Sequence, residues 1–395
     1  MDHDLPPLRI RGRTLLPIVQ GGMGVGISAH RLAGAVAALG AVGTIASVDL
    51  RRLHDDLMRR LRKVRDPQAH TEANLEALDR EIRAAREIAG PEGFVAVNVM
   101  HALREYREHV RQACASGADA IVCGAGLPLD LPDLTKDHPD VALIPIVSEP
   151  RGARALLRRW LRKGRLPDAM VVEHPGHAGG HLGATRMEDV SSPRFDFATV
   201  IEGLRQVFRE LGIAFERIPL IAAGGLAAFE KMREVLAMGF SAVQLGTAFA
   251  VTEECDAHPN FKRVLADARP GDIVTFLSAA GLPARAVLTP WLRRYLSREA
   301  RLRAEARPEC GRCPGEIQCL AHCGFKDGNP AAGQFCIEAR LAAAQRGHVG
   351  QGLFFRGAGS LPFGREIRPV RDLIRYLLTG ERAPATPRAA TAAVS

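Results

Sequence analysis

The chain has 395 residues, of which 47% are hydrophobic, and its formal net charge is +9. This composition excludes a globally disordered protein, and without a run of about 18 apolar residues we expect no membrane span. The N-terminus lacks the basic and then apolar pattern of a signal peptide, and no nucleic-acid-binding motif accompanies the positive charge. We therefore expect a cytoplasmic protein that binds neither nucleic acid nor membrane.

Eight short apolar segments alternate with helical patterns over residues 1–250, and each is typical of a buried parallel strand. The first helix is expected to begin at Ser28 as its cap, and 51–89 predicts one or two charged helices. Glycines follow five of the eight strands, which favours an α/β fold of the (β/α)8 TIM barrel type over a doubly wound sheet. The expected strands are 14–20, 41–47, 94–100, 120–123, 142–147, 169–173, 218–222 and 242–245.

The pattern changes after residue 250, and we expect a smaller cysteine-rich lobe over 251–365. Segment 370–378 is amphipathic, and 366–380 is expected to return to the barrel as a helix, followed by a disordered tail over 381–395. Within the lobe, the expected elements are helices over 260–268, 290–306 and 334–346, and a hairpin from strands 272–278 and 284–288.

The sixth expected strand ends at Glu173 and runs into segment 174–183, which contains three histidines and four glycines. Such a segment brings backbone N–H groups close to an anionic ligand and holds an imidazole beside it. Glycines also follow the seventh and eighth strands, where barrels commonly bind phosphate. Met23 and Asn98 suit the flat face and a polar atom of FMN, although core packing and a satisfied buried amide are the alternatives for these two residues.

Four motifs, at 17–24, 178–183, 221–225 and 244–249, resemble the nitronate monooxygenase (2-nitropropane dioxygenase) family. The resemblance covers about residues 8–290. It implies a TIM barrel that binds FMN non-covalently, with His181 as the catalytic imidazole, whereas His174 and His177 are expected to be structural or to lie behind the site. The residues expected to bind the cofactor are Gly22, Met23, Asn98, Glu173, Gly179, Gly180, Gly224, Gly225, Gln244, Gly246 and Thr247.

Five of the eight cysteines lie within residues 310–336. In a cytoplasmic protein this crowding favours a metal site over disulfides, and the spacing leaves zinc, an iron–sulfur cluster and an unmetallated set open. Segments 319–324 and 333–337 resemble a branch of the same family that carries a [4Fe–4S] cluster beside FMN. The resemblance implies four ligands, with Cys313 favoured over Cys310 for the fourth, among Cys310, Cys313, Cys319, Cys323 and Cys336.

That branch includes a bifunctional acyl-carrier-protein dehydrogenase/isomerase of bacterial unsaturated fatty acid synthesis. The resemblance therefore implies oxidation of a medium-chain, decanoyl-type thioester, with His181 moving the protons and with dioxygen or another acceptor taking the electrons from the flavin. The basic run from Arg154 to Arg165 is a candidate docking face for the acidic carrier protein, or simply a solvated helix.

Three other hypotheses remain open. Oxidation of small alkyl nitronates with dioxygen needs no carrier protein, and NAD(P)H-driven reduction of enoyl thioesters or quinones uses the same barrel. An iron–sulfur sensor on an inactive barrel is opposed by His181 and the intact glycine loops. The sequence is also compatible with a homodimer.

Overall fold

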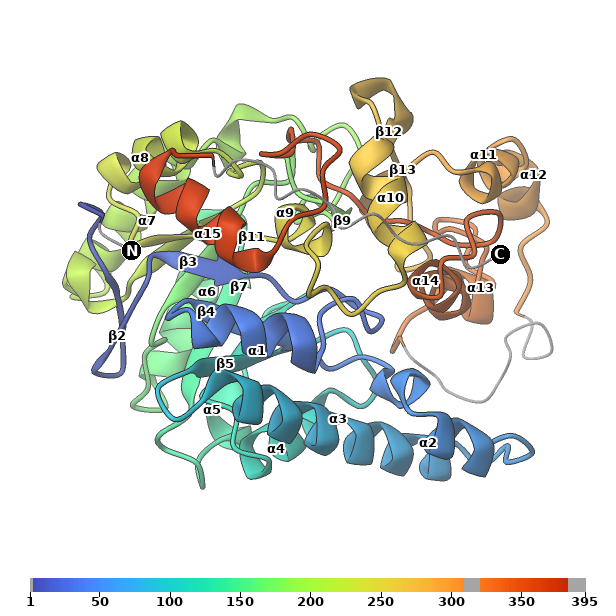
Figure 1. Ribbon diagram of the computed structural model, residues 1–395, viewed down its shortest axis with the longest axis horizontal. Coiled ribbons are helices and arrows are strands. Elements are labelled where there is room, and N and C mark those ends of the chain that lie inside the picture. The colour runs from blue at the N-terminus through green and yellow to red at the C-terminus, as the bar shows by residue number, and fades with distance from the viewer. Residues whose placement is uncertain (1–2, 309–319, 383–395) are drawn as a thin grey trace, which may run out of the picture.

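The computed structural model describes residues 3–308 and 320–382 (Figure 1). Eight parallel strands close into a barrel in the order β10-β11-β3-β4-β5-β6-β7-β8, so the predicted TIM barrel is confirmed. The barrel strands are β3 (Ile18–Gln20), β4 (Val42–Ala46), β5 (Phe94–Met100), β6 (Ala120–Gly124), β7 (Ala142–Val147), β8 (Met170–Glu173), β10 (Leu220–Ala223) and β11 (Ala242–Leu245).

Helices surround the barrel because successive side chains of each strand point to opposite faces. In β5, Ala96 packs inside the barrel, whereas Val95 and Val97 belong to the apolar cluster under the helices. The helices of the barrel are α1 (His30–Ala38), α2 (Asp55–Arg60), α3 (Pro67–Ala89), α4 (Tyr106–Ala115), α5 (Leu131–Leu134), α6 (Pro150–Leu161), α7 (Phe197–Glu210), α8 (Phe229–Met238), α9 (Thr247–Ala250) and α15 (Val370–Thr379). Among the described residues, no helix is both long enough and apolar enough to cross a bilayer.

Helix α15 occupies the place of an eighth barrel helix, although more than a hundred residues separate it from β11. It packs against α8 on one side and α1 on the other, and buries Val370, Leu373 and Leu377. The intervening lobe is therefore an insertion within the last βα unit of the barrel. The predicted tail, 381–395, lies outside the described residues from position 383 onward.

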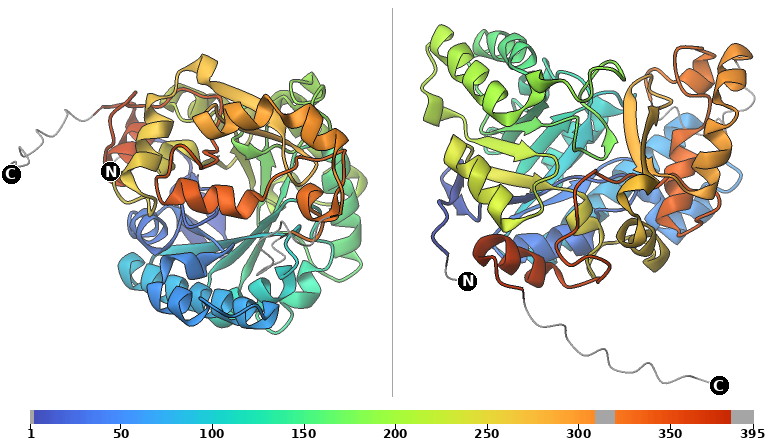
Figure 2. Two further views of the ribbon diagram at one scale, coloured as in Figure 1. Left: turned by 90° about the vertical axis from the view of Figure 1, so that its right-hand side faces the viewer. Right: turned by 90° about the horizontal axis from the view of Figure 1, so that it is seen from above.

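The lobe covers one end of the barrel (Figure 2). Strand β13 pairs with β12 and also with β9 (Gly180–His181), a two-residue strand from the histidine-rich segment after β8. The histidine-rich segment thus connects barrel and lobe. The elements of the lobe are α10 (Pro259–Asp267), β12 (Ile273–Leu277), β13 (Pro283–Val287), α11 (Pro290–Leu296), α12 (Glu299–Ala304), α13 (Gly324–Asp327) and α14 (Ile337–Gln345).

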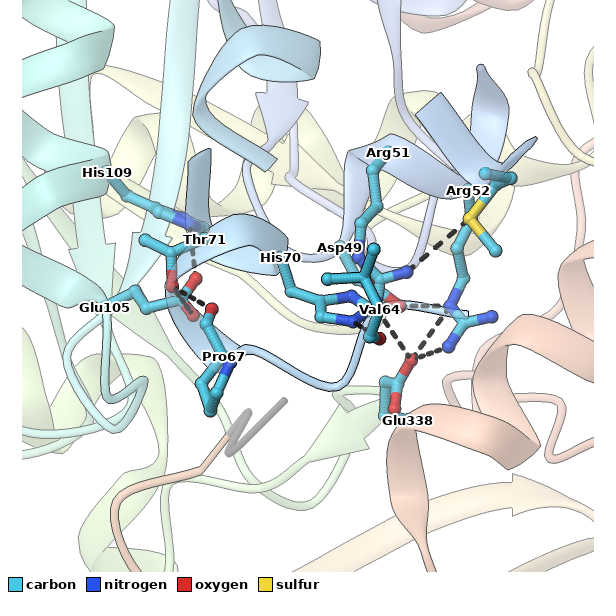
Figure 3. A network of polar contacts seen from close by, with 11 residues as sticks. Asp49, Arg51, Arg52, Val64, Pro67, His70, Thr71, Glu105, His109 and Glu338 are labelled. Atoms are coloured by element: carbon cyan, nitrogen blue, oxygen red, sulfur yellow. Dashed lines mark hydrogen bonds and ion pairs between the residues drawn. The ribbon is translucent and has the colours of Figure 1, made fainter. Parts of the chain in front are cut away.

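A buried ion-pair network also joins the two parts (Figure 3). Arg52, from the segment after β4, donates from Nε to Glu338 Oε1 of α14 at 2.8 Å. Arg51, which is almost fully buried, contacts Asp49 at 3.1 Å between Nη2 and Oδ1. Burial and the neighbouring Glu338 raise the pKa of Asp49 well above its usual range. Removing one partner would leave a buried charge uncompensated, so the network fixes α14 on the barrel.

The strand predicted over 14–20 is wrong, because two separate strands occupy this stretch. The first, β2 (Arg13–Leu15), pairs with β1 (Leu8–Ile10) in a hairpin outside the barrel. Pro17, which lacks an N–H donor, separates it from β3, and Leu16 instead donates its amide to Gly40 O at 2.8 Å.

Two helix predictions also need correction. Ser28 does not cap α1, because its hydroxyl accepts the Met23 amide at 2.8 Å, and the Asp256 carboxylate takes the Ala29 amide at 2.9 Å instead. The helix predicted over 290–306 is divided into α11 and α12. Ser297, at the break, donates its hydroxyl to Arg294 O at 3.0 Å, a local contact that competes with helix continuation.

Candidate active site

A cavity of about 780 Å³ lies at the carboxyl ends of the barrel strands, under the lobe. Because parallel strands of a closed barrel all end at the same face, residues far apart in the chain meet there. The cavity wall includes every residue predicted to bind the cofactor, together with His181. These residues are Gly22, Met23, Asn98, Glu173, Gly179, Gly180, His181, Gly224, Gly225, Gln244, Gly246 and Thr247.

The glycines of this wall stand where a side chain would not fit. A Cβ on Gly22 would lie 2.3 Å from Asn98 Cβ, and one on Gly225 would lie 2.9 Å from His177 Cβ. Gly224 and Gly225 also have positive φ angles, of +112° and +72°. No acceptor among the described residues takes the amide hydrogen of Gly225. The backbone here therefore suits the close approach of a phosphate group, as FMN requires.

His181 is held at the boundary between barrel and lobe. Its backbone lies opposite Ala284 in the β9–β13 ladder, and its ring meets Phe355 edge to face, with centroids 5.6 Å apart. Its Nε2 atom is buried and has no hydrogen-bond partner in the described part of the chain. Burial lowers the pKa of His181 to about 4, so the imidazole is neutral near pH 7 and can accept a proton.

The other two histidines of the segment differ from His181. Both ring nitrogens of His174 have partners, because Nδ1 accepts the Gly176 amide at 3.0 Å and Nε2 lies 3.3 Å from Asp196 Oδ1. His177 lines the cavity beside Gly225, and burial lowers its pKa. His174 is thus a structural residue, whereas His177 belongs to the cavity wall.

Glu173 ends β8 and also lines the cavity. Burial raises the pKa of its carboxyl group to about 7. No ion pair to it is present among residues 3–308 and 320–382. This carboxyl group therefore changes its charge close to neutral pH, at the edge of the proposed FMN site.

Arg285 is a residue of this region that the sequence did not indicate. It lies opposite Gly180 in β13, and its guanidinium donates to Pro175 O at 3.0 Å and to Ala178 O. The side chain is 6% exposed. Arg285 thus fixes the backbone on the N-terminal side of His181, from a position more than a hundred residues further along the chain.

The lobe supplies an apolar wall to the cavity, which the sequence also did not indicate. The residues of this wall come from the β12–β13 turn, the segment before α13, α14 and the segment after α14, where apolar spacing resembles ordinary core packing. They are Leu282, Leu320, Ile337, Leu341, Leu353 and Phe355.

Of the predicted metal ligands, Cys310, Cys313 and Cys319 lie outside the described residues. Cys323 is buried at the start of α13 and donates its amide to Asp327 Oδ2 at 2.8 Å, and Cys336 immediately precedes α14. The described residues contain no group of three or more candidate metal ligands. Leu320, the residue after Cys319, bridges to Leu103 and lines the cavity. The metal site therefore stays a prediction.

Comparison with known proteins gives the family. The sequence model of the family described as nitronate monooxygenase matches residues 11–380. A probable nitronate monooxygenase of Bacillus subtilis is 29% identical over 123 residues, which is 31% of this chain and 33% of that protein. A nitronate monooxygenase of Pseudomonas aeruginosa is 31% identical over 115 residues, 29% of this chain and 30% of that protein. The aligned part thus spans about a third of the length of these curated relatives.

Solved structures share the fold over nearly the whole chain. FabK from Thermotoga maritima superposes with a TM-score of 0.63 and 23% identity, over 92% of this chain and 91% of that one. Nitroalkane oxidase from Streptomyces ansochromogenes gives a TM-score of 0.60 and 22% identity, over 91% and 94%. At this identity the likeness shows the fold alone. Since the family match extends from residue 11 to residue 380, the chain belongs to the nitronate monooxygenase family of FMN-dependent oxidoreductases.

Proposed function

We propose that the protein oxidises a medium-chain acyl thioester carried by an acyl carrier protein, and then shifts the new double bond. One observation carries this proposal. A neutral imidazole, that of His181, with an unpartnered Nε2 lies between a glycine-lined wall and an apolar wall of the same cavity. The first wall suits a phosphorylated cofactor, and the second suits an acyl chain.

The glycine-lined wall fits FMN. The amide of Gly225 is available for its phosphate, Gly224 leaves room for it, and Met23 and Asn98 lie on the same wall for its ring system. When bound, FMN supplies the acceptor for a hydride and passes the electrons on to dioxygen.

His181 is the group that moves protons. Its Nε2 removes the proton from the carbon next to the thioester carbonyl, while the hydrogen of the following carbon leaves as hydride, so that a C=C bond forms and the two electrons go to the cofactor. Isomerisation then needs only removal of a proton from C4 and delivery of one to C2. A single imidazole can do both, because it gives back the proton that it takes.

The lobe wall binds the acyl chain. Leu282, Leu341 and Leu353 line the cavity from the lobe. Burial of each CH₂ group is worth about 0.8 kcal/mol, so a chain of medium length gains enough binding free energy to favour it over a short one.

Helix α6 offers a docking face for the carrier protein. Within the predicted basic run, Arg154 is paired with Glu210 at 2.9 Å and Arg165 with Asp168 at 2.6 Å, so these two are neutralised within the chain. Arg158 and Arg162 are exposed and have no ion pair among the described residues. Arg158 and Arg162 follow Arg151 by seven and eleven residues, so the three side chains share a helix face. Arg151 lines the cavity. An acidic carrier helix on this face would lie beside the mouth of the cavity.

We further propose that four of the cysteines Cys310, Cys313, Cys319, Cys323 and Cys336 hold a [4Fe–4S] cluster. The position of Leu320 in the cavity wall supports a cluster near the site. Iron and sulfide analysis of anaerobically purified protein, with an absorption spectrum, tests this. Zinc in place of iron, or no metal, would overturn it.

Oxidation of small alkyl nitronates is the second candidate function, favoured by the nitronate monooxygenase relatives. Anaerobic single-turnover experiments separate the two. Decanoyl carrier protein should bleach the flavin and yield an enoyl product detectable by mass spectrometry, faster than propyl-2-nitronate does. Bleaching by the nitronate alone would establish the second candidate, and bleaching by NADH alone would instead indicate a reductase.

Docking of the carrier protein on α6 can be tested separately. The double variant Arg158→Gln/Arg162→Gln should raise KM for the carrier-bound substrate several-fold and leave KM for a carrier-free acyl thioester unchanged. An equal rise for both substrates would exclude α6 as the docking face.

A further inference from the structure

We propose that the lobe segment Phe355–Leu361, here called the strap, closes over the phosphate end of the FMN site, and that buried Arg356 is the positioning residue that holds it there. The inference rests on FMN as the family's cofactor and not on the identity of the substrate.

The strap crosses the glycine loops of the barrel at three points. The Gly357 amide donates to Thr247 Oγ1 at 3.0 Å, and the Ala358 amide donates to His177 O at 3.1 Å. A Cβ on Gly359 would lie 3.3 Å from Gly225 Cα. The strap therefore touches the segments that follow β8, β10 and β11, where the phosphate of FMN is expected.

Arg356 fixes the strap through hydrogen bonds of its side chain. Its side chain is 5% exposed, and it donates from Nε to Leu265 O at 2.9 Å and from Nη1 to Gly357 O at 2.8 Å. The same Nη1 lies 3.3 Å from Gly359 O. Its partners in the described chain are carbonyl oxygens, and no carboxylate lies within ion-pair distance there. Since a guanidinium stays charged in proteins, its positive charge is uncompensated, and a nearby anion would be stabilised.

The direction of the peptides adds a second argument. In a trans peptide the C=O and N–H bonds point in opposite directions, so the Gly359 carbonyl that faces Arg356 turns the Ser360 amide away from the guanidinium. No described acceptor takes this amide hydrogen. Gly359 and Ser360 both line the cavity. The amide is thus available to an oxygen of a ligand phosphate.

Comparing FMN with riboflavin isolates the phosphate, because riboflavin has the same ring and ribityl chain without it. We expect Arg356→Gln to raise the dissociation constant of FMN at least about tenfold, equal to about 1.4 kcal/mol, and that of riboflavin less than about threefold. Arg356→Lys keeps the charge but loses the fork of donors. Its dissociation constant for FMN should therefore lie between those of the wild type and Arg356→Gln. Both constants are measured on apoprotein by quenching of flavin fluorescence.

Gly359→Ala and Gly350→Ala form a matched pair of lobe variants. A Cβ at Gly359 meets Gly225, whereas a Cβ at Gly350 meets nothing within 4 Å. Gly359→Ala should weaken the binding of FMN more than the binding of riboflavin, and Gly350→Ala should change neither dissociation constant. Equal weakening of both flavins by Arg356→Gln and Gly359→Ala, or no change by either, would overturn the proposal. If Arg356→Gln does not fold, Gly359→Ala decides alone. No substrate is present, so the result is independent of the proposed acyl oxidation.

Discussion

The two walls of the cavity differ in what they are made of. The barrel wall presents glycine backbone, the Asn98 amide and the Glu173 carboxyl group, at or near the ends of the strands. The lobe wall presents leucine side chains and Phe355. Backbone amides fixed at strand ends recognise groups that do not vary, such as a phosphate, whereas apolar side chains can be exchanged to fit another substrate. We therefore expect the barrel wall to supply most of the contacts to the cofactor, and the leucines of the lobe wall to decide the substrate.

His181 belongs to both walls, since it follows a barrel strand and pairs with a strand of the lobe. Substitution of His181 should therefore have the largest effect on activity. His181→Gln should lower kcat/KM by about 10²–10⁴-fold because the proton acceptor is lost, while FMN binding stays intact. Steady-state kinetics and the flavin content of the purified protein measure the two effects. Since burial holds the pKa of His181 at about 4, activity of the wild type should fall only as the pH drops toward that value.

Exposed His348→Gln is the matched control and should leave kcat/KM unchanged. A His181→Gln enzyme that keeps more than a tenth of the activity would remove His181 from the mechanism.

Arg285 joins the walls from behind, and its loss should have the next largest effect. Hydrogen bonds to charged groups are worth about 1.5–3 kcal/mol, so Arg285→Gln should lower kcat about tenfold, with KM little changed, and lower the thermal unfolding midpoint. Arg285→Lys should restore part of kcat, because it still donates to one carbonyl. Arg293→Gln, on the exposed face of α11, is the control. Unchanged kcat with a lowered midpoint would show a purely structural role.

Glu173 tests the electrostatics of the barrel wall. Its pKa is raised from 4.5 to about 7, so between these pH values the folded protein binds a proton that the unfolded chain has released. This contribution stabilises the protein at low pH and is lost as the pH rises through about 7. Glu173→Gln should therefore gain stability over the wild type at pH 8, by about 1–3 kcal/mol, and little at pH 4.

Thermal unfolding of the apoprotein at the two pH values measures this difference. The exposed Glu216→Gln variant should have the same stability as the wild type at both pH values. If wild type and Glu173→Gln keep the same difference in midpoint at both pH values, the carboxyl group does not titrate as described.

The lobe wall gives the smallest expected effect and the one most specific for substrate. Leu341→Trp fills part of the space beside the lobe wall. It should therefore raise KM for a decanoyl thioester about five- to tenfold and leave KM for a butanoyl thioester unchanged. Leu341→Met, which conserves volume, should change neither value appreciably. Equal changes for long and short chains would show that the acyl chain does not lie along this wall.

Local patterns in the sequence were enough to predict the barrel, and with the family resemblance they indicated residues that all line one cavity. Eight buried strands repeat the same apolar signal, and the glycines after β3 and β10 lie immediately after their strands, so closing the barrel is sufficient to bring Gly22 and Gly225 together. The physical reason is that strand period and turn chemistry act over a few residues. Ser28 shows the limit of such signals, because Asp256, more than two hundred residues away, took the place of the expected cap.

Contacts between distant segments were decided by the tertiary structure alone. The place of the lobe within the last βα unit follows from the packing of α15 against α8 and α1. Arg285 reaches Pro175 across 110 residues, and Arg356 reaches Leu265 across 91. A buried guanidinium has the same local sequence signal as an exposed one. What distinguishes Arg285 and Arg356 is the set of carbonyl groups that the fold places around each of them.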